Sequence, residues 1–198
     1  NFGIGGTSVI SNPLYNATVG TVNYSKYTGI TNNTFLEWRF NGGYRITGKL
    51  GLTKQNDEAN VFLPAGHTAF ANITDYNSEA YATRGSYDRS NSSFFNYDAS
   101  LVGDYSKTFG KNLIFATLGF SVAEQQSQAT AISGIGFANN GLDELFCGNA
   151  CRNGSRPSGQ NNISRRFSSF ANFNYTYDRR FLFDLALNID GSTQFGEL

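Results

Sequence analysis

The sequence predicts an all-β protein: an antiparallel meander of long hairpins that forms part of a large transmembrane β-barrel with short periplasmic turns and long extracellular loops. Three observations lead to this prediction. Apolar and polar residues alternate along several stretches, which is typical of strands with one apolar and one polar face. These stretches are longer than most strands of soluble proteins. Short turns and long connections also follow one another in regular order along the chain.

Composition agrees with this fold class and restricts the function. The 198 residues include 22 Gly, 18 Phe and 11 Tyr but only 3 Pro, and 15% of them are charged. The formal net charge is zero and there is no basic block, so we expect no nucleic-acid partner. No apolar run approaches the roughly 18 residues of a transmembrane helix. Barrel strands remain possible, because half of their residues face a polar lumen.

The first predicted hairpin lies near residues 31–53. Its apolar face includes Trp38 and Leu50, and its charged face includes Arg45 and Lys49. A turn at 41–43 joins the two arms. In a soluble sheet the charged face would meet solvent, whereas in a barrel it would meet the water-filled lumen.

The second hairpin is predicted near residues 95–124. Leu118 and Phe120 lie on its apolar face, and Asp98 and Asp104 on its polar face. The turn is predicted at 107–111.

The third hairpin, near residues 166–190, has the clearest pattern. Its apolar face carries Leu185 and Leu187 among several aromatic residues. The polar face is formed by Asn172, Asn174, Asp184 and Asn188. Only Asp178, Arg179 and Arg180 separate the arms, which predicts a tight turn.

The length of the arms favours a membrane barrel. Soluble strands most often have about 5–6 residues, whereas a tilted bilayer crossing takes about 9–11. Long loops are predicted at 54–79 and 124–164, opposite the short turns. Six strands cannot close such a barrel, which needs at least about eight. We therefore expect the chain to be a single segment of a barrel domain whose remaining strands lie outside it.

Few residues suggest other chemistry. Cys147 and Cys151 lie in a Gly- and Asn-rich loop, where a local disulfide is plausible in an oxidising compartment. His67 is the only histidine and lies far from both, so no metal site is expected. No nucleophile motif surrounds His67, and Asp143 and Glu144 are too close in sequence to face each other across a glycosidic bond. We expect neither an enzyme nor a cofactor.

Several segments resemble the middle of the barrel of SusC/RagA-like TonB-dependent transporters of Bacteroidetes outer membranes. The resemblance covers nearly the whole chain. Its most specific parts are Asn32 to Trp38 and the pattern from Tyr175 through Asp178-Arg179-Arg180-Phe181-Leu182 and Asp190-Gly191-Ser192 to Phe195-Gly196. The segment Asn12 to Ala17 adds a weaker signal.

The resemblance implies a 22-stranded barrel in the outer membrane with an N-terminal plug domain that lies, like the TonB-contacting segment, upstream of this chain. It also implies nutrient uptake: glycans or peptides would be captured with a SusD-like surface lipoprotein and imported with energy from TonB.

The resemblance also suggests roles for particular residues. The inward residues would hydrogen-bond the plug or line the lumen; alternatively they only keep a polar face hydrated. They are Arg45, Lys49, Asp98, Asp104, Asn172, Asn174, Asp184 and Asn188. Four loop aromatics would contact the substrate or the lipoprotein, or would instead pack the loops on themselves. They are Tyr76, Tyr81, Phe137 and Phe146.

Two other functions fit parts of the pattern. In a secreted β-sandwich, such as a carbohydrate-binding or adhesin module, the apolar faces would form a core, and the chain would fold alone without detergent. A passive porin would share the barrel but lack a plug. Labelling of Trp38, Leu50, Leu118, Phe120, Leu185 and Leu187 by a lipid-soluble probe would distinguish the barrels from the sandwich.

Overall fold

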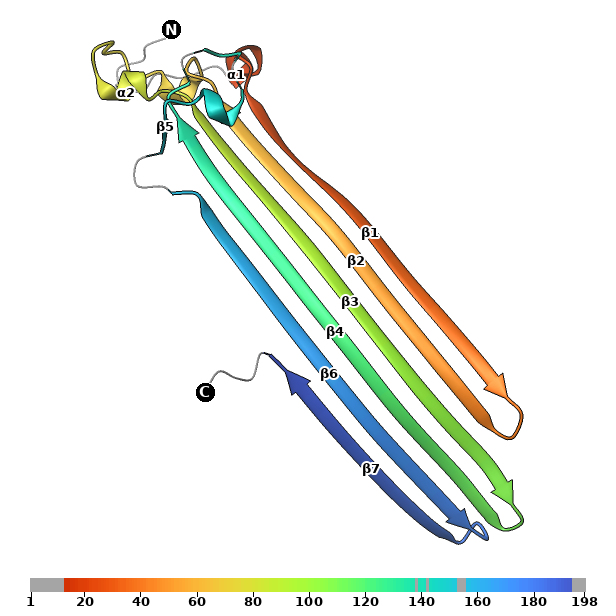
Figure 1. Cartoon of the computed structure of the whole chain (residues 1–198). Coiled ribbons are helices and arrows are strands. Elements are labelled where there is room, and N and C mark those ends of the chain that lie inside the picture. The colour runs from red at the N-terminus through yellow and green to blue at the C-terminus, as the bar shows by residue number, and fades with distance from the viewer. Residues whose placement is uncertain (1–12, 138, 142, 153–155, 194–198) are drawn as a thin grey trace, which may run out of the picture. The chain divides into compact units, whose positions relative to one another are not determined.

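The computed structural model describes residues 13–137, 139–141, 143–152 and 156–193. Antiparallel strands dominate it, which confirms the predicted fold class. The six long strands pair in the order β1-β2-β3-β4-β6-β7 (Figure 1). Their bounds are Val22–Phe40 (β1), Tyr44–Leu63 (β2), Ser86–Phe109 (β3), Asn112–Ile135 (β4), Ser158–Tyr177 (β6) and Phe181–Ser192 (β7). A two-residue strand, β5 (Ala150–Cys151), pairs with the end of β4.

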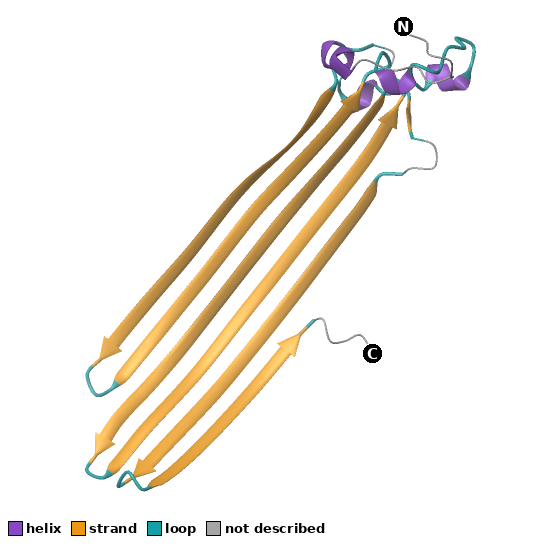
Figure 2. Cartoon of the chain, turned by 180° about the vertical axis from the view of Figure 1, so that it is seen from behind, coloured by secondary structure: helices purple, strands orange, loops and turns teal. Residues whose placement is uncertain are grey.

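The helices are short; α1 precedes β1, and the others lie in the connections between strands (Figure 2). They are α1 (Pro13–Thr18), η1 (Thr68–Phe70), α2 (Glu79–Ala82) and η2 (Leu145–Cys147). Ser78 caps α2, because its hydroxyl accepts a hydrogen bond from the Tyr81 amide. No helix in the described part of the chain is long and apolar enough to cross a membrane.

The strands are longer than the sequence predicts. β2 continues to Leu63 and β3 begins at Ser86, so most of the first half of the loop predicted at 54–79 is strand. The loop predicted at 124–164 is likewise shortened at both ends by β4 and β6. Next to the apolar stretches, the added strand residues are polar or small on both faces, as from Gln55 to Asn60 on β2; apolar side chains such as Phe62 and Tyr87 return only at the far ends. Hydrophobic alternation therefore ends before the hydrogen-bonded strand does.

The two chain ends also carry more regular structure than predicted. Residues 13–18 form α1, and β1 already begins at Val22, ahead of the first hairpin predicted near residues 31–53. β7 extends to Ser192, slightly beyond the third hairpin predicted near residues 166–190. Phe195 and Gly196, part of the family resemblance, lie outside the described residues.

The turns between paired strands are tight. Gly42 and Gly43 have φ values of 95° and 91° at the β1–β2 turn, where side chains rarely fit. The β3–β4 turn consists of Gly110 and Lys111 alone, so the predicted turn at 107–111 is too long. At the β6–β7 turn Asp178 and Arg179 both have positive φ, 50° and 56°.

Alternation of the two faces can be followed along the β2–β3 and β6–β7 pairs. On β2 and β3, the contacts Arg45–Asp104 and Asp57–Ser92 follow one common register. β6 and β7 pair from Arg166–Ser192 to Tyr177–Phe181 without a bulge. Odd and even positions of a strand can therefore be assigned to opposite faces of the sheet.

Contacts divide the chain into two compact units. Unit 1 comprises residues 1–27, 56–92 and 129–160, and unit 2 comprises 28–55, 93–128 and 161–198. Unit 1 contains the helices and a small aromatic cluster of Phe62, Tyr87 and Phe137. Unit 2 contains the three short turns, and most of its large apolar side chains are exposed.

Candidate functional site

The apolar face of unit 2 is a broad exposed surface. Trp38, Leu118 and Leu187 each expose about half of their area, at 53%, 50% and 58%. Aromatic side chains are concentrated near the turns, where Tyr44 stacks on Tyr105 with ring centroids 4.5 Å apart. The described residues provide no second layer that covers this face.

The opposite face of unit 2 holds the residues predicted to face a lumen, and several of them contact each other. Arg45 binds Asp104 through Nη2 at 2.7 Å, and Thr117 donates a hydrogen bond to the same carboxylate at 2.9 Å. Asn174 donates to Asp184 across the β6–β7 pair at 2.6 Å. These contacts connect polar side chains from five strands on one face.

The other predicted lumen residues are more scattered. Asp98 lies over Gly51, whose missing Cβ would fall 2.4 Å from Oδ1 of Asp98. Asn188 donates to Asp190 on its own strand, and Asn172 pairs with Ala186 across the β6–β7 ladder. Lys49 is exposed.

Asp98 and Asp190 border a hollow of about 600 Å³ together with Arg166. Small side chains such as Ser100, Ser121 and Ser168 form much of its lining. Arg166 is the only cation in this lining. The hollow can therefore present both charges to a polar group that enters it.

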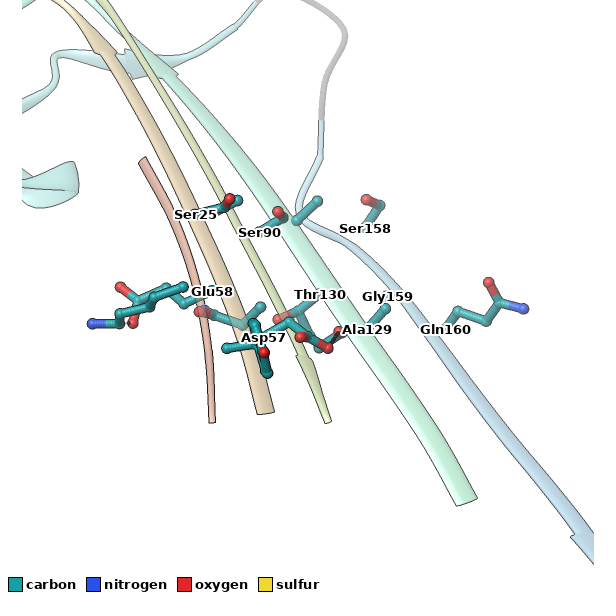
Figure 3. A pocket seen from close by; sticks show the side chains of 15 residues that line it. Ser25, Asp57, Glu58, Ser90, Ala129, Thr130, Ser158, Gly159 and Gln160 are labelled. Carbon is teal, nitrogen blue, oxygen red and sulfur yellow. Dashed lines mark hydrogen bonds and ion pairs between the residues drawn. The ribbon is translucent and has the colours of Figure 1, made fainter. Parts of the chain in front are cut away.

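A second polar hollow, of about 580 Å³, lies in unit 1. Its lining comes from five strands, with Ser25, Ser90 and Ser158 from β1, β3 and β6 (Figure 3). Asp57 accepts a hydrogen bond from Ser92 at 3.0 Å within it. Since Ala129 and Ala131 also line it, the floor is made of small residues and leaves room for a ligand or another polypeptide.

An ion-pair network lies on the other face of the same strands. Lys26 Nζ is 2.9 Å from Glu58 Oε2, and Asn60 donates to Glu58 Oε1 at 2.7 Å. The hydrogen bond from Lys26, followed by that from Asn60, lowers the pKa of Glu58 below its usual value. The hydrogen bond between Lys26 and Glu58 also raises the pKa of Lys26. Arg89 approaches Glu58 more loosely, at 3.5 Å.

Two of the four predicted loop aromatics form a stack. The rings of Tyr76 and Tyr81 are 4.6 Å apart, and the Arg84 guanidinium lies 3.4 Å from the Tyr81 ring centroid. Tyr76 is 78% exposed. One face of the Tyr76 ring therefore packs on Tyr81, and the exposed face suits a planar or apolar ligand group.

The other two loop aromatics lie in opposite surroundings. Phe146 is 84% exposed and remains a candidate contact. Phe137 is fully buried, and its ring meets Phe62 edge-to-face at 5.3 Å. Burial prevents Phe137 from contacting a substrate, so its predicted role is wrong and the alternative, loop packing, describes it.

The two cysteines differ in environment. Cys147 packs against the aromatic cluster, whereas Cys151 is exposed and pairs with Gly134. Both thiols are free in this structure, and the predicted disulfide stays a prediction. Within the described ranges, no group of three or more His, Cys, Asp or Glu side chains is placed to hold a metal ion.

Comparison with solved structures identifies the fold. The structure of the RagAB peptide transporter matches 91% of this chain with a TM-score of 0.70 and 18% sequence identity. The chain has the fold of a segment of this transporter. The RagAB peptide importer in the 'open-open' state matches with a TM-score of 0.69 over 91% of the chain, at 19% identity. The 'closed-closed' state matches with 0.65 over 89%, also at 19% identity.

In each comparison the match covers 19% of the RagAB chain. The resemblance to SusC/RagA-like transporters predicted this fold, and the RagAB matches confirm it. No protein-family model and no curated protein sequence matches the chain.

The sequence predicts neither the Lys26–Glu58–Arg89 network nor the two polar hollows. Glu58 lies in the loop predicted at 54–79, and Lys26 and Arg89 lie outside the predicted hairpins. The network's only signal in the sequence is that residues beyond Leu52 continue to alternate between the two faces of β2. That signal is weak, because neither face of the strand is apolar there.

Proposed function

We propose that this chain is part of the barrel wall of a TonB-dependent outer-membrane importer that works with a SusD-like surface lipoprotein. The apolar face of unit 2 would meet lipid, and the face with Arg45, Asp104, Asn174 and Asp184 would meet the lumen or a plug. The chain would supply wall and loops and no catalytic group.

One observation carries the membrane assignment. On β2 and β4 the apolar alternation next to the short turn runs from Tyr44 to Leu52 and from Ile114 to Val122, about as long as a bilayer crossing, which takes roughly 9–11 residues. It then ends at charged or polar residues, such as Lys54 on β2 and Glu124 on β4, although the strands continue. A β-sandwich core would give no reason for hydrophobicity to stop in mid-strand.

The remaining strand length has a function in this proposal. β3 and β4 have 24 residues each, about twice what a crossing needs. Their far portions carry polar residues on both faces, as expected of a wall with water on both sides. This part would stand outside the membrane, where the hollow with Asp57 and Ser92 would be open to incoming substrate.

Peptides are the better-supported substrate class, since the matched structures are those of a peptide transporter. The stacked Tyr76–Tyr81 pair suits side chains that carry rings or cations. Arg166 with Asp98 and Asp190 suits a polar partner in the lumen, such as a plug loop. Glycans remain the second class, since an exposed tyrosine face also stacks on sugars.

Uptake by the full-length natural protein tests the proposal. The host bacterium would be grown with peptides as its nitrogen source, with and without the gene that contains this sequence. We expect loss of the gene, or of TonB, to abolish entry of a fluorescent peptide. We also expect the tagged full-length protein to copurify with a surface lipoprotein. Unchanged peptide and glycan uptake, with the protein found in the soluble secreted fraction, would instead support the β-sandwich module.

A further inference from the structure

The apolar face of unit 2 is not smooth. It contains a hollow of about 610 Å³, within the roughly 300–1,000 Å³ typical of small-molecule sites. Gly103, Ala116 and Ala171 form its floor, and larger residues including Tyr44, Tyr105 and Phe173 surround them. The hollow exists because small residues from three adjacent strands lie together where the rest of the face carries Leu and Phe.

The hollow lies at the short-turn end of the sheet. Tyr44 follows the β1–β2 turn directly, and the Gly43 carbonyl accepts a hydrogen bond from the Ser106 amide at 2.9 Å. The Tyr44–Tyr105 stack therefore lies within a few residues of the turns. An occupant would fill the hollow with an apolar part while another part remained at the water interface.

A cation lies on the turn side of the same face. Lys107 is two residues beyond Tyr105 on β3, so its side chain shares the face of Tyr105. Its Nζ is 4.9 Å from the centroid of the Phe109 ring. Within the described ranges, Lys107 has no carboxylate partner. The neighbouring cations Arg39 and Lys111, in contrast, are paired with Glu37 and Asp178.

The hollow and Lys107 together select a ligand with an anionic group joined to a slender apolar chain. A glycerophospholipid combines both in one molecule. Its phosphate would accept hydrogen bonds from the ammonium group, and its acyl chain would replace the missing side chains over the floor. Basic residues at the membrane surface attract lipid phosphates in the same way.

We propose that this hollow is a binding site for one glycerophospholipid of the leaflet on the short-turn side, with Lys107 bound to the phosphate and an acyl chain over Gly103, Ala116 and Ala171. The inference rests on the proposed membrane function. It adds a defined lipid site to the apolar face of unit 2, the lipid-facing belt, which would otherwise contact lipid without selection.

Photo-crosslinking of the full-length protein tests this site. The protein would be reconstituted into phosphatidylethanolamine vesicles that contain a phosphatidylethanolamine with a diazirine in its acyl chain. Labelled peptides would then be identified by mass spectrometry. We expect labelling of peptides that contain residues 44–46, 103–105, 116–118 and 171–173 to exceed that of other belt positions several-fold.

Two matched pairs of variants separate a site from general lipid contact. Gly103→Leu fills the floor, and its added Cβ meets only the Leu118 carbonyl, at 4.0 Å. Gly48→Leu adds the same bulk to the same face outside the hollow, where nothing lies within 4 Å. Lys107→Gln removes the cation, and Lys49→Gln removes one from the opposite face. Only Gly103→Leu and Lys107→Gln should lower the excess labelling several-fold.

Labelling near Phe120 and Val122 reports insertion of each variant, since both lie on the belt outside the hollow. Uniform belt labelling that Gly103→Leu leaves unchanged would overturn the lipid site but leave the importer proposal intact. Absence of labelling at every belt position, Phe120 included, would overturn both.

Discussion

Phe137 and Phe146 come from the same connection and carry the same side chain, but only Phe137 is buried. Its ring contacts Phe62 and Tyr87, and its backbone amide donates a hydrogen bond to Arg84 at 2.9 Å. Gly85, with φ of +83°, lets Phe137 approach, because a Cβ at Gly85 would lie 2.9 Å from that of Phe137. Phe137 thus links the connection after β4 to the one before β3.

Truncation of Phe137 should loosen these connections, whereas truncation of Phe146 should not. Phe137→Ala removes a fully buried ring and leaves a cavity, which typically costs about 3–5 kcal/mol. Phe146→Ala changes an exposed side chain, and such changes usually stay within about 0.5 kcal/mol. Amide hydrogen exchange of residues 64–85 and 136–152 in the full-length protein measures both effects. Equal protection in the two variants would show that the aromatic cluster does not hold the connections.

Glu58 concentrates several contacts in one carboxylate. It accepts from Lys26, Asn60 and more weakly Arg89, and Asn60 is itself buried and accepts a hydrogen bond from Tyr87. The pKa of Tyr87 is raised by burial. The network thereby joins β1, β2 and β3 in unit 1.

These contacts predict an acid-sensitive region. The pKa of Glu58 lies below its ordinary value of 4.5, so the network contributes stability above that value and loses it as the pH falls through the lowered pKa. The raised pKa of Lys26 has the opposite consequence, since its contribution is lost only as alkaline pH rises through that value. Hydrogen exchange around residues 24–26 and 58–60 should accelerate, after correction for intrinsic rates, as the pH falls below 4.5.

Glu58→Gln provides the control for this acid sensitivity. A glutamine keeps an acceptor for Asn60 but cannot titrate, so protection in the variant should be lower at neutral pH and no longer fall in acid. An acid-dependent loss of protection that persists in Glu58→Gln would assign the effect to another carboxylate.

At the scale of the strand, two faces of β4 have different requirements. Leu118 lies on the apolar face and is half exposed, whereas Ser121 lines the polar hollow with Asp98 and Asp190. Because the strand alternates without a bulge, a shift of three positions moves a side chain from one face to the other.

A charge should therefore be costly at Leu118 and tolerated at Ser121. Leu118→Lys places an ammonium group on the proposed lipid face, where Lys costs about 2–4 kcal/mol near the bilayer midplane. Ser121→Lys places it beside two carboxylates. Folding of the full-length variants into phospholipid vesicles, followed in urea, measures the difference. Similar stabilities would argue that the Leu118 face does not meet lipid.

The β6–β7 turn shows how hairpins are tied together. The Asp178 amide donates to the Lys111 carbonyl at 2.8 Å, and Lys111 Nζ is 3.2 Å from Asp178 Oδ1. These contacts link the turn to that of the preceding hairpin. They compensate for positive φ at Asp178 and Arg179, a conformation that costs a non-glycine residue about 1 kcal/mol or more.

At the scale of the whole molecule, the proposal predicts a much longer natural polypeptide. The chain matches 19% of the RagAB chain, and among the described residues β1 and β7 are each paired on one side only. An unpaired backbone edge in lipid costs several kcal/mol per polar group, so both edges need partner strands. Denaturing mass spectrometry of the protein from isolated outer membranes should give a mass several times 21.7 kDa. A mature species near 21.7 kDa would exclude the barrel.

The sequence predicts the strands well only where one face is apolar. Phe181 to Ile189 alternate strictly, and the structure has β7 there. Lys54 to Leu63 were assigned to a loop although they continue β2, because the polar residues on both faces from Gln55 to Asn60 remove the hydrophobic signal. Helix α2 was missed for another reason: its four residues depend on the Ser78 cap and on packing near Gly136, both too local for a periodic pattern.

The alternation of single residues was sufficient to define the all-β class, the antiparallel hairpins and the two kinds of face, because side chains of a strand point to opposite sides whatever the strand pairs with. The true strand ends, the burial of Phe137, the contacts of Glu58 and the hollow over Gly103, Ala116 and Ala171 follow only from the tertiary structure. Each depends on which residues of neighbouring strands or connections lie side by side, and that register is set by pairing and packing between segments distant in the sequence.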